Sequence, residues 1–135
     1  MTLGIPIVNT AETEAFWAAG AAGQLVVEQC VDCGLHIFPP RGICRRCHGR
    51  TLVDCVVTPP GEIYSYTVNQ NAWAPDAEAV YTVGLVEFPN FSSIRFVGRV
   101  EGFDGEPTIG DRVNFELRPA FGDRFQITFT PWDET

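Results

Sequence analysis

The sequence predicts a mainly β protein with three consecutive parts: a short N-terminal helix, a small metal-bound ribbon and a closed barrel of five strands. Three observations lead to this prediction. One helical segment stands near the start, two Cys-x-x-Cys pairs follow it, and the remaining residues alternate between apolar and polar with the period of β-strands. We place the boundaries of the helical segment, the ribbon and the barrel at residues 1–24, 25–50 and 51–135.

The helical segment reads AETEAFWAAGAAG and covers residues 11–23. A polar pair that can cap a helix precedes it, and glycines end it. Its apolar anchors are Phe16 and Trp17. Two interpretations stay open for these rings: they pack onto the rest of the chain, or the helix docks on a partner, because a single short helix is only marginally stable alone.

Four of the five cysteines form two pairs, Cys30 with Cys33 and Cys44 with Cys47. An odd cysteine count without a secretion signal argues against a disulfide framework. Two such pairs match a tetrahedral four-cysteine zinc site with Zn–S bonds of ~2.3 Å. We therefore predict a rubredoxin-like zinc ribbon with one structural zinc per chain. With four protein ligands, the zinc would support folding and leave no open position for chemistry.

The residues that follow each pair support this interpretation. Gly34 follows the first pair and His48-Gly49 follows the second, at positions where a tight turn favours a residue that tolerates positive φ. A redox dithiol and a metal-free set of cysteines are the alternatives. Both histidines, His36 and His48, are expected at the surface, and Cys55 is expected to be a buried strand thiol.

Four of the nine arginines lie in one stretch of ten residues inside the ribbon, at Arg41, Arg45, Arg46 and Arg50. One interpretation is that they offset the negative charge of a zinc tetrathiolate and face solvent. The other is that they bind phosphate, because a guanidinium can donate two hydrogen bonds to phosphate oxygens.

The rest of the chain alternates like antiparallel strands. We expect a first, long and bent strand with Pro59-Pro60-Gly61 at its bend and four shorter strands after it. These segments are 51–57 with 62–69, then 81–88, 93–100, 112–118 and 124–130. Five strands of this kind favour a C-terminal five-stranded OB-fold barrel, which removes exposed strand edges by closing.

The composition is globular, with 45% hydrophobic and 19% charged residues. No apolar run approaches the ~20 residues of a membrane helix, and the N-terminus lacks a signal peptide, so we expect a cytoplasmic protein. The net charge is −8 and all nine basic residues are arginine. This charge opposes sequence-independent binding of nucleic acid, but it is compatible with a small anion held by local arginines.

The sequence contains no Gly-x-Ser-x-Gly, no phosphate-binding glycine loop and no His-Glu-x-x-His motif, and both histidines lie beside the ribbon. We therefore predict no catalytic residues in this chain. The most exposed recognition candidate is the polar segment 69–79, which contains Trp73. Trp73 either folds back onto the barrel or contacts a ligand or partner.

The order of these parts resembles a family of zinc-ribbon plus OB-fold proteins that accompany thiolase-fold enzymes. The resemblance covers nearly the whole chain. Its specific parts, besides the cysteine pairs, are GQLVVEQC (23–30), FPPR (38–41), GEIYSYT (61–67), IGDRV (109–113) and FTP (129–131). Arg45 and His48 stand where the family often has Pro and Gly. These differences alter the surface of the second cysteine turn, so the resemblance does not decide which partner is recognised.

The resemblance implies a non-catalytic accessory subunit that binds a thiolase-fold partner as a heterotetramer and helps it bind or position an acyl-CoA at or near the interface. The partners of this family are thiolases, hydroxymethylglutaryl-CoA synthases, polyketide-type acyltransferases and thiolase-like aldolases that shorten steroid side chains. The chemistry belongs to the partner.

Under this interpretation, Arg41, Arg45, Arg46 and Trp73 are candidates for contact with the CoA phosphates or the partner, and Phe16 and Trp17 are candidates for docking. We expect neither a nucleic-acid nor a membrane partner. Two alternatives remain. One is an OB-fold protein that binds single-stranded nucleic acid, with Tyr64 and Tyr66 as stacking residues, although the net charge of −8 opposes it. The other is an autonomous enzyme.

Overall fold

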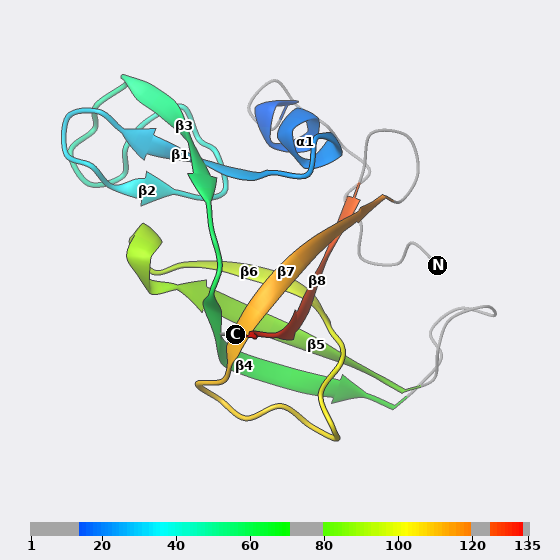
Figure 1. Ribbon diagram of the computed structural model, residues 1–135. Coiled ribbons are helices and arrows are strands. Elements are labelled where there is room, and N and C mark those ends of the chain that lie inside the picture. Colours follow the sequence, from blue (N-terminus) through cyan, green and yellow to red (C-terminus); the bar gives the residue numbers. More distant parts are fainter. Residues whose placement is uncertain (1–13, 71–79, 120–124, 134–135) are drawn as a thin grey trace.

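The computed structural model describes residues 14–70, 80–119 and 125–133. Its elements are α1 (Glu14–Ala21), β1 (Leu25–Cys30), β2 (His36–Ile37), β3 (Leu52–Val57), β4 (Gly61–Asn69), β5 (Tyr81–Phe88), η1 (Pro89–Phe91), β6 (Ile94–Val100), β7 (Arg112–Pro119) and β8 (Phe125–Pro131). The predicted mainly β fold with one N-terminal helix is confirmed (Figure 1). Within the described residues, no helix is long and apolar enough to cross a membrane.

The strands form two sheets. The ribbon sheet has the order β2-β1-β3, and the second sheet closes into a barrel with the order β4-β5-β6-β8-β7. Closure comes from the pairing of β4 with β7, where Gly61 lies opposite Val113. This five-stranded closed barrel has the OB-fold architecture that the alternating sequence predicts.

The structure corrects two expectations about the strands. Residues 51–57 were expected to begin the first barrel strand, but β3 pairs along its whole length with β1 of the ribbon. The bend at Pro59-Pro60 therefore separates two sheets, and the first barrel strand begins at Gly61. The barrel is also not wholly antiparallel, because β6 and β8 run parallel.

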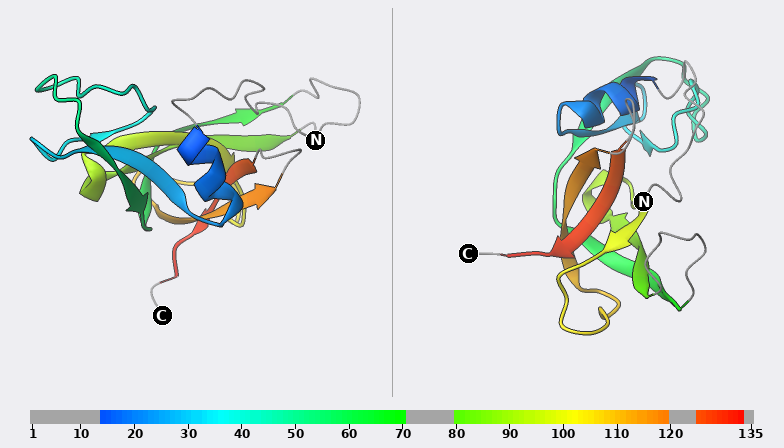
Figure 2. Two further views of the ribbon diagram at one scale, coloured as in Figure 1. Left: turned by 90° about the horizontal axis from the view of Figure 1, so that it is seen from above. Right: turned by 90° about the vertical axis from the view of Figure 1, so that its right-hand side faces the viewer.

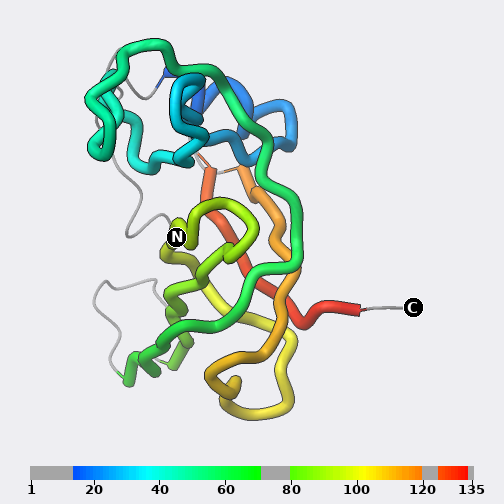
Figure 3. The backbone as a smooth tube through the Cα atoms, turned by 90° about the vertical axis from the view of Figure 1, so that its left-hand side faces the viewer, coloured from blue at the N-terminus to red at the C-terminus, as the bar shows by residue number. Residues whose placement is uncertain are grey.

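One of the two apolar clusters among the described residues joins the two sheets. Its largest fully buried side chains include Phe88 and Phe129 of the barrel together with Leu25, Val27 and Val57 of the ribbon sheet. Figure 3 shows the ribbon lying across one end of the barrel. The ribbon sheet therefore packs on the barrel as a layer of the same domain.

Helix α1 packs its aromatic rings inside the chain. The Phe16 ring lies 5.1 Å from the Phe125 ring and 5.2 Å from the Phe38 ring, and Trp17 is buried. A Cβ atom at Gly20 would lie 1.8 Å from the Phe125 ring, so this glycine lets the helix approach β8 closely (Figure 2). The rings thus serve the chain's own core, and their role in docking stays a prediction.

A β-bulge changes the faces expected for β4. The pairing of β4 with β5 shifts register between Ile63 and Ser65. Tyr64 is consequently exposed on the outside, whereas Tyr66 packs partly buried against the core. The two tyrosines do not lie on one face, so they cannot form the joint stacking platform that a nucleic-acid-binding interpretation would use.

Candidate functional site

The four predicted ligand sulfurs come together in the ribbon. Their Sγ atoms all lie within 4.8 Å of one another, with Cys30 to Cys47 at 3.6 Å and Cys33 to Cys44 at 3.5 Å. These distances far exceed the ~2.05 Å of a disulfide. They approach the ~3.8 Å edge of a tetrahedron with Zn–S bonds of ~2.3 Å. The arrangement can hold one metal ion with four thiolate ligands.

Two turns with matching hydrogen bonds position the sulfurs. In the first, the Cys30 amide donates to the Leu35 carbonyl, and the Gly34 amide donates to the Cys30 carbonyl. In the second, the Cys44 amide donates to the Gly49 carbonyl, and the His48 amide donates to the Cys44 carbonyl. The first cysteine of each pair thus anchors a tight turn that aims both sulfurs inward, as the spacing predicts.

The predicted need for positive φ is confirmed in both turns, at Gly34 (φ 81°) and at His48 (φ 63°). A left-handed backbone costs a non-glycine residue about 1–2 kcal/mol. We expect His48→Gly to raise the free energy of unfolding by up to about 1 kcal/mol, after the extra freedom of glycine in the unfolded chain is subtracted. Urea unfolding with saturating zinc measures this change. Gly34→Ala is the matched control and should destabilise, whereas a destabilised His48→Gly variant would contradict the prediction.

Backbone amides and an arginine surround the thiol cluster. The Gly49 amide donates to the Cys47 sulfur at 3.4 Å, and the Arg46 Nη2 donates to the Cys33 carbonyl at 2.9 Å. A Cβ atom at Gly49 would lie 2.7 Å from Asp32 Oδ2 and 3.2–3.3 Å from two ligand sulfurs, so a side chain here would crowd the cluster. Arg46 thus bonds to the cysteine turn, and both interpretations of the ribbon arginines stay predictions.

The thiols perturb one another's ionisation. A hydrogen bond from the Leu35 amide lowers the pKa of Cys33 to about 6. The Gly49 amide lowers the pKa of Cys47, but contact with neighbouring thiols and burial outweigh it and raise this pKa to about 12. The two pKa values thus shift in opposite directions within one cluster.

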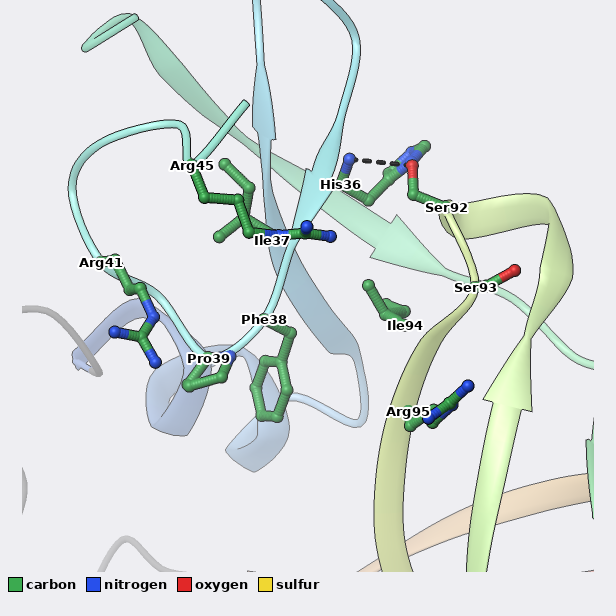
Figure 4. Close-up of a pocket in the computed structure, with 10 residues that line it drawn as sticks. All are labelled: His36, Ile37, Phe38, Pro39, Arg41, Arg45, Ser92, Ser93, Ile94 and Arg95. Atoms are coloured by element: carbon green, nitrogen blue, oxygen red, sulfur yellow. Dashed lines mark hydrogen bonds between the residues drawn. The ribbon is translucent and has the colours of Figure 1, made fainter. Parts of the chain in front are cut away.

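A pocket of about 470 Å³ lies where the ribbon meets the barrel. Figure 4 shows residues of the ribbon on one side and residues of the segment that enters β6 on the other. The lining residues are His36, Ile37, Phe38, Pro39, Arg41, Arg45, Ser92, Ser93, Ile94 and Arg95. The lining thus combines apolar side chains with three arginines and two serines, and the Arg95 guanidinium is held by Tyr64 and Glu87. This combination suits a ligand with anionic groups and an apolar part.

The ribbon arginines take different positions. Arg41 and Arg45 line the pocket, whereas Arg46 bonds to the cysteine turn and Arg50 is exposed outside the lining residues. The Glu28 carboxylate accepts hydrogen bonds from the amides of Arg41 and Gly42, which holds the loop that carries Arg41. Trp73, the fourth candidate for ligand contact, lies outside the described residues.

A polar contact fixes the two walls of the pocket. The His36 amide donates to Ser92 Oγ at 3.0 Å, and His36 Nδ1 lies 2.8 Å from the same oxygen. Ser92 and Ser93 both adopt left-handed backbone conformations, with φ of 59° and 56°. Strain of this kind persists where the surroundings hold it, here through the contact with His36. Burial lowers the pKa of His36, which favours its neutral form.

Sequence reasoning missed the barrel wall of the pocket. The wall residues Ser92, Ser93 and Arg95 lie at the start of the predicted strand 93–100 or just before it, and they carry no motif. The expectation that this chain lacks a catalytic set stays a prediction. Within the described residues, His36 contacts Ser92 but has no carboxylate partner that would complete a Ser-His-Asp arrangement.

Comparisons with known proteins agree with this architecture. Residues 17–53 match the model of the ChsH2 rubredoxin-like zinc ribbon domain, and residues 56–118 match that of the ChsH2 C-terminal OB-fold domain. A search of curated proteins found no match.

Two solved structures resemble the chain. A chain of the structure titled "Ltp2-ChsH2(DUF35) aldolase" has a TM-score of 0.81 and 25% identity over 93% of this chain and 98% of its own length. A DUF35 protein of unknown function from Sulfolobus solfataricus has a TM-score of 0.66 and 17% identity over 92% of this chain and 87% of its own, a likeness of fold. The chain belongs to the ChsH2 family, in which a rubredoxin-like zinc ribbon precedes an OB-fold barrel.

Proposed function

We propose that this chain is a non-catalytic accessory subunit of a thiolase-fold aldolase and helps that enzyme to bind and position an acyl-CoA. The similar ChsH2 chain belongs to an aldolase structure. The pocket supplies the observation that carries the proposal, because its lining combines arginines with apolar side chains in a chain of net charge −8. CoA offers matching chemistry, with phosphates at one end and a long pantetheine arm.

We propose zinc as the metal of the four-cysteine cluster. Four thiolates in a tetrahedral arrangement favour zinc, which has no redox chemistry and needs no open position here. Bound zinc would supply folding energy and would fix the loop between Cys44 and Cys47, which carries Arg45. Zinc held by these four sulfurs would therefore fix the ribbon wall of the ligand pocket and would have a structural role.

We place this subunit in a cytoplasmic heterotetramer with its aldolase partner, in the degradation of acyl-CoA or steroid side chains. The heterotetramer and the pathway rest on the family resemblance, and the cytoplasmic location rests on the sequence signals described above. In this arrangement the partner supplies the nucleophile and the acid–base residues, and the accessory chain supplies the cationic wall that holds the CoA phosphates.

Calorimetric titration of the purified complex with octanoyl-CoA tests the proposed role. We expect Arg45→Ala to raise the Kd about tenfold, because a hydrogen bond to a charged group contributes about 1.5–3 kcal/mol and each 1.4 kcal/mol is a factor of ten. Arg50→Ala is the matched control, since Arg50 is exposed on the same ribbon but does not line the pocket. Equal affinities for the wild type and Arg45→Ala would contradict the assignment.

A further inference from the structure

The outer face of β4, β5 and β6 carries a second surface with the chemistry of a binding site. We call it the outer sheet face; it consists of Tyr64, Tyr81, Val83, Leu85, Arg95, Val97 and Arg99. The register sets Leu85 opposite Val97, and Val83 opposite Arg99. Their sequence neighbours Val86, Phe96 and Val100 point into the barrel and are buried. Alternation thus places these seven side chains outward.

The described residues leave apolar side chains of this face open, and the polar residues Ser65, Thr67 and Glu87 lie among them. Val97 is 65% exposed on β6, and Tyr64 is 46% exposed at the bulge of β4. Helix α1 contacts β1, β7 and β8, and so it lies away from this face (Figure 1). An apolar strip flanked by polar groups is typical of a protein interface.

Two arginines are fixed in place on this face. The Arg95 guanidinium lies 3.8 Å from the centre of the Tyr64 ring, and that of Arg99 lies 4.2 Å from the centre of the Tyr81 ring. Arg95 also bonds to Glu87 at 3.1 Å. Stacked arginine and tyrosine side chains lose little freedom on binding, and both residue types are enriched where interfaces bind most tightly.

The outer sheet face is continuous with the pocket, and this continuity indicates which partner would cover the face. Arg95 lines the pocket and also stacks on Tyr64, so the cationic rim of the pocket runs directly onto the outer sheet face. Under the proposed function, on which this step rests, an acyl-CoA held in the pocket must reach catalytic residues on another chain. That chain has to cover the surface that adjoins the pocket.

We propose that the catalytic aldolase subunit docks on the outer sheet face, with apolar side chains on the strip around Val97 and carboxylates facing Arg95 and Arg99. A nucleic acid is a poorer fit, because the face offers two arginines in a chain of net charge −8 and its tyrosines are already covered by guanidinium groups.

Val97→Asp tests the docking surface by placing a charge in the centre of the strip. Val56→Asp is the matched control, because Val56 is also an exposed strand valine, 43% exposed, but lies on β3 of the ribbon. We expect Val97→Asp to raise the Kd for the aldolase subunit at least about thirtyfold in calorimetry, and Val56→Asp to change it less than about threefold. Circular dichroism and thermal unfolding establish that both variants fold.

The outcomes separate the two proposals. If the wild-type chain forms no complex with the aldolase subunit, the proposed function fails. If the complex forms and a folded Val97→Asp variant binds equally well, the docking surface is wrong while the proposed function stands. If Val97→Asp and Val56→Asp weaken binding of the aldolase subunit equally, the proposed docking surface is also wrong.

Two further arms test other occupants. Concentration-dependent dimerisation of the chain alone that Val97→Asp abolishes would identify a second copy as the occupant. Binding of a fluorescent oligo-dT that the same substitution abolishes would identify nucleic acid. Either result overturns the inference, whereas a monomeric chain that binds no oligo-dT supports it.

Discussion

Cys44→Ser is expected to abolish stoichiometric zinc binding and to destabilise the chain by about 5 kcal/mol or more. Cys44 is fully buried, and among the described residues the ribbon's own core consists of Cys30, Leu35, Ile37 and Cys44 with two partly buried neighbours. So small a core cannot hold the turns together without the metal. Structural zinc supplies about 10–16 kcal/mol of apparent binding energy in small peptides, so the loss of one ligand has a large effect.

Elemental analysis and thermal unfolding measure this result together. Cys55→Ser is the matched control, since Cys55 is a partly buried thiol on β3 outside the four-sulfur cluster. It should keep one zinc per chain and lose about 1 kcal/mol. Native protein without zinc, together with an unchanged melting temperature for Cys44→Ser, would contradict both the metal assignment and its structural role.

Gly98→Ala is expected to destabilise the barrel by about 3 kcal/mol, because it forces two strands apart. A Cβ atom at this position would lie 2.4 Å from the Ile127 carbonyl oxygen and 2.8 Å from the Phe129 ring. The oxygen belongs to the backbone of β8, so it cannot rotate away as a side chain would. The contact lies where β6 and β8 approach in parallel to close the barrel.

Thermal unfolding should show a fall of roughly 10 °C for Gly98→Ala. Gly105→Ala separates this crowding from the cost of the backbone conformation, because Gly105 has φ 86° with no atom within 4 Å of its Cβ position. That control should lose only about 1 kcal/mol. A Gly98→Ala variant as stable as the control would show that β8 can shift to make room.

The ribbon could be predicted from the sequence because its geometry depends on local spacing. Two residues between paired cysteines fix each turn, and the turn requires positive φ at Gly34 and His48 wherever the rest of the chain lies. The helix and the barrel strands follow local periodicity in the same way. These features need no knowledge of which segments meet in space.

The misassigned strand and the pocket depend on contacts that periodicity does not encode. Alternation over 51–57 predicts a strand but not its sheet, and the segment pairs with β1 across the ribbon. The bulge at Tyr64 adds one residue without a sequence signature and exchanges the faces of β4. The pocket joins His36 to Ser92 across 56 residues, so its second wall emerges only when the ribbon packs on the barrel.

The apolar interior shared by Leu25, Val27 and Val57 with the barrel has a consequence for how this chain can be divided. The two family matches meet between residues 53 and 56, inside β3. A cut there would remove part of the apolar packing of the barrel and would expose apolar side chains of the ribbon to solvent. Neither half is therefore a free-standing module, and gene fusions or swaps between relatives must carry both together.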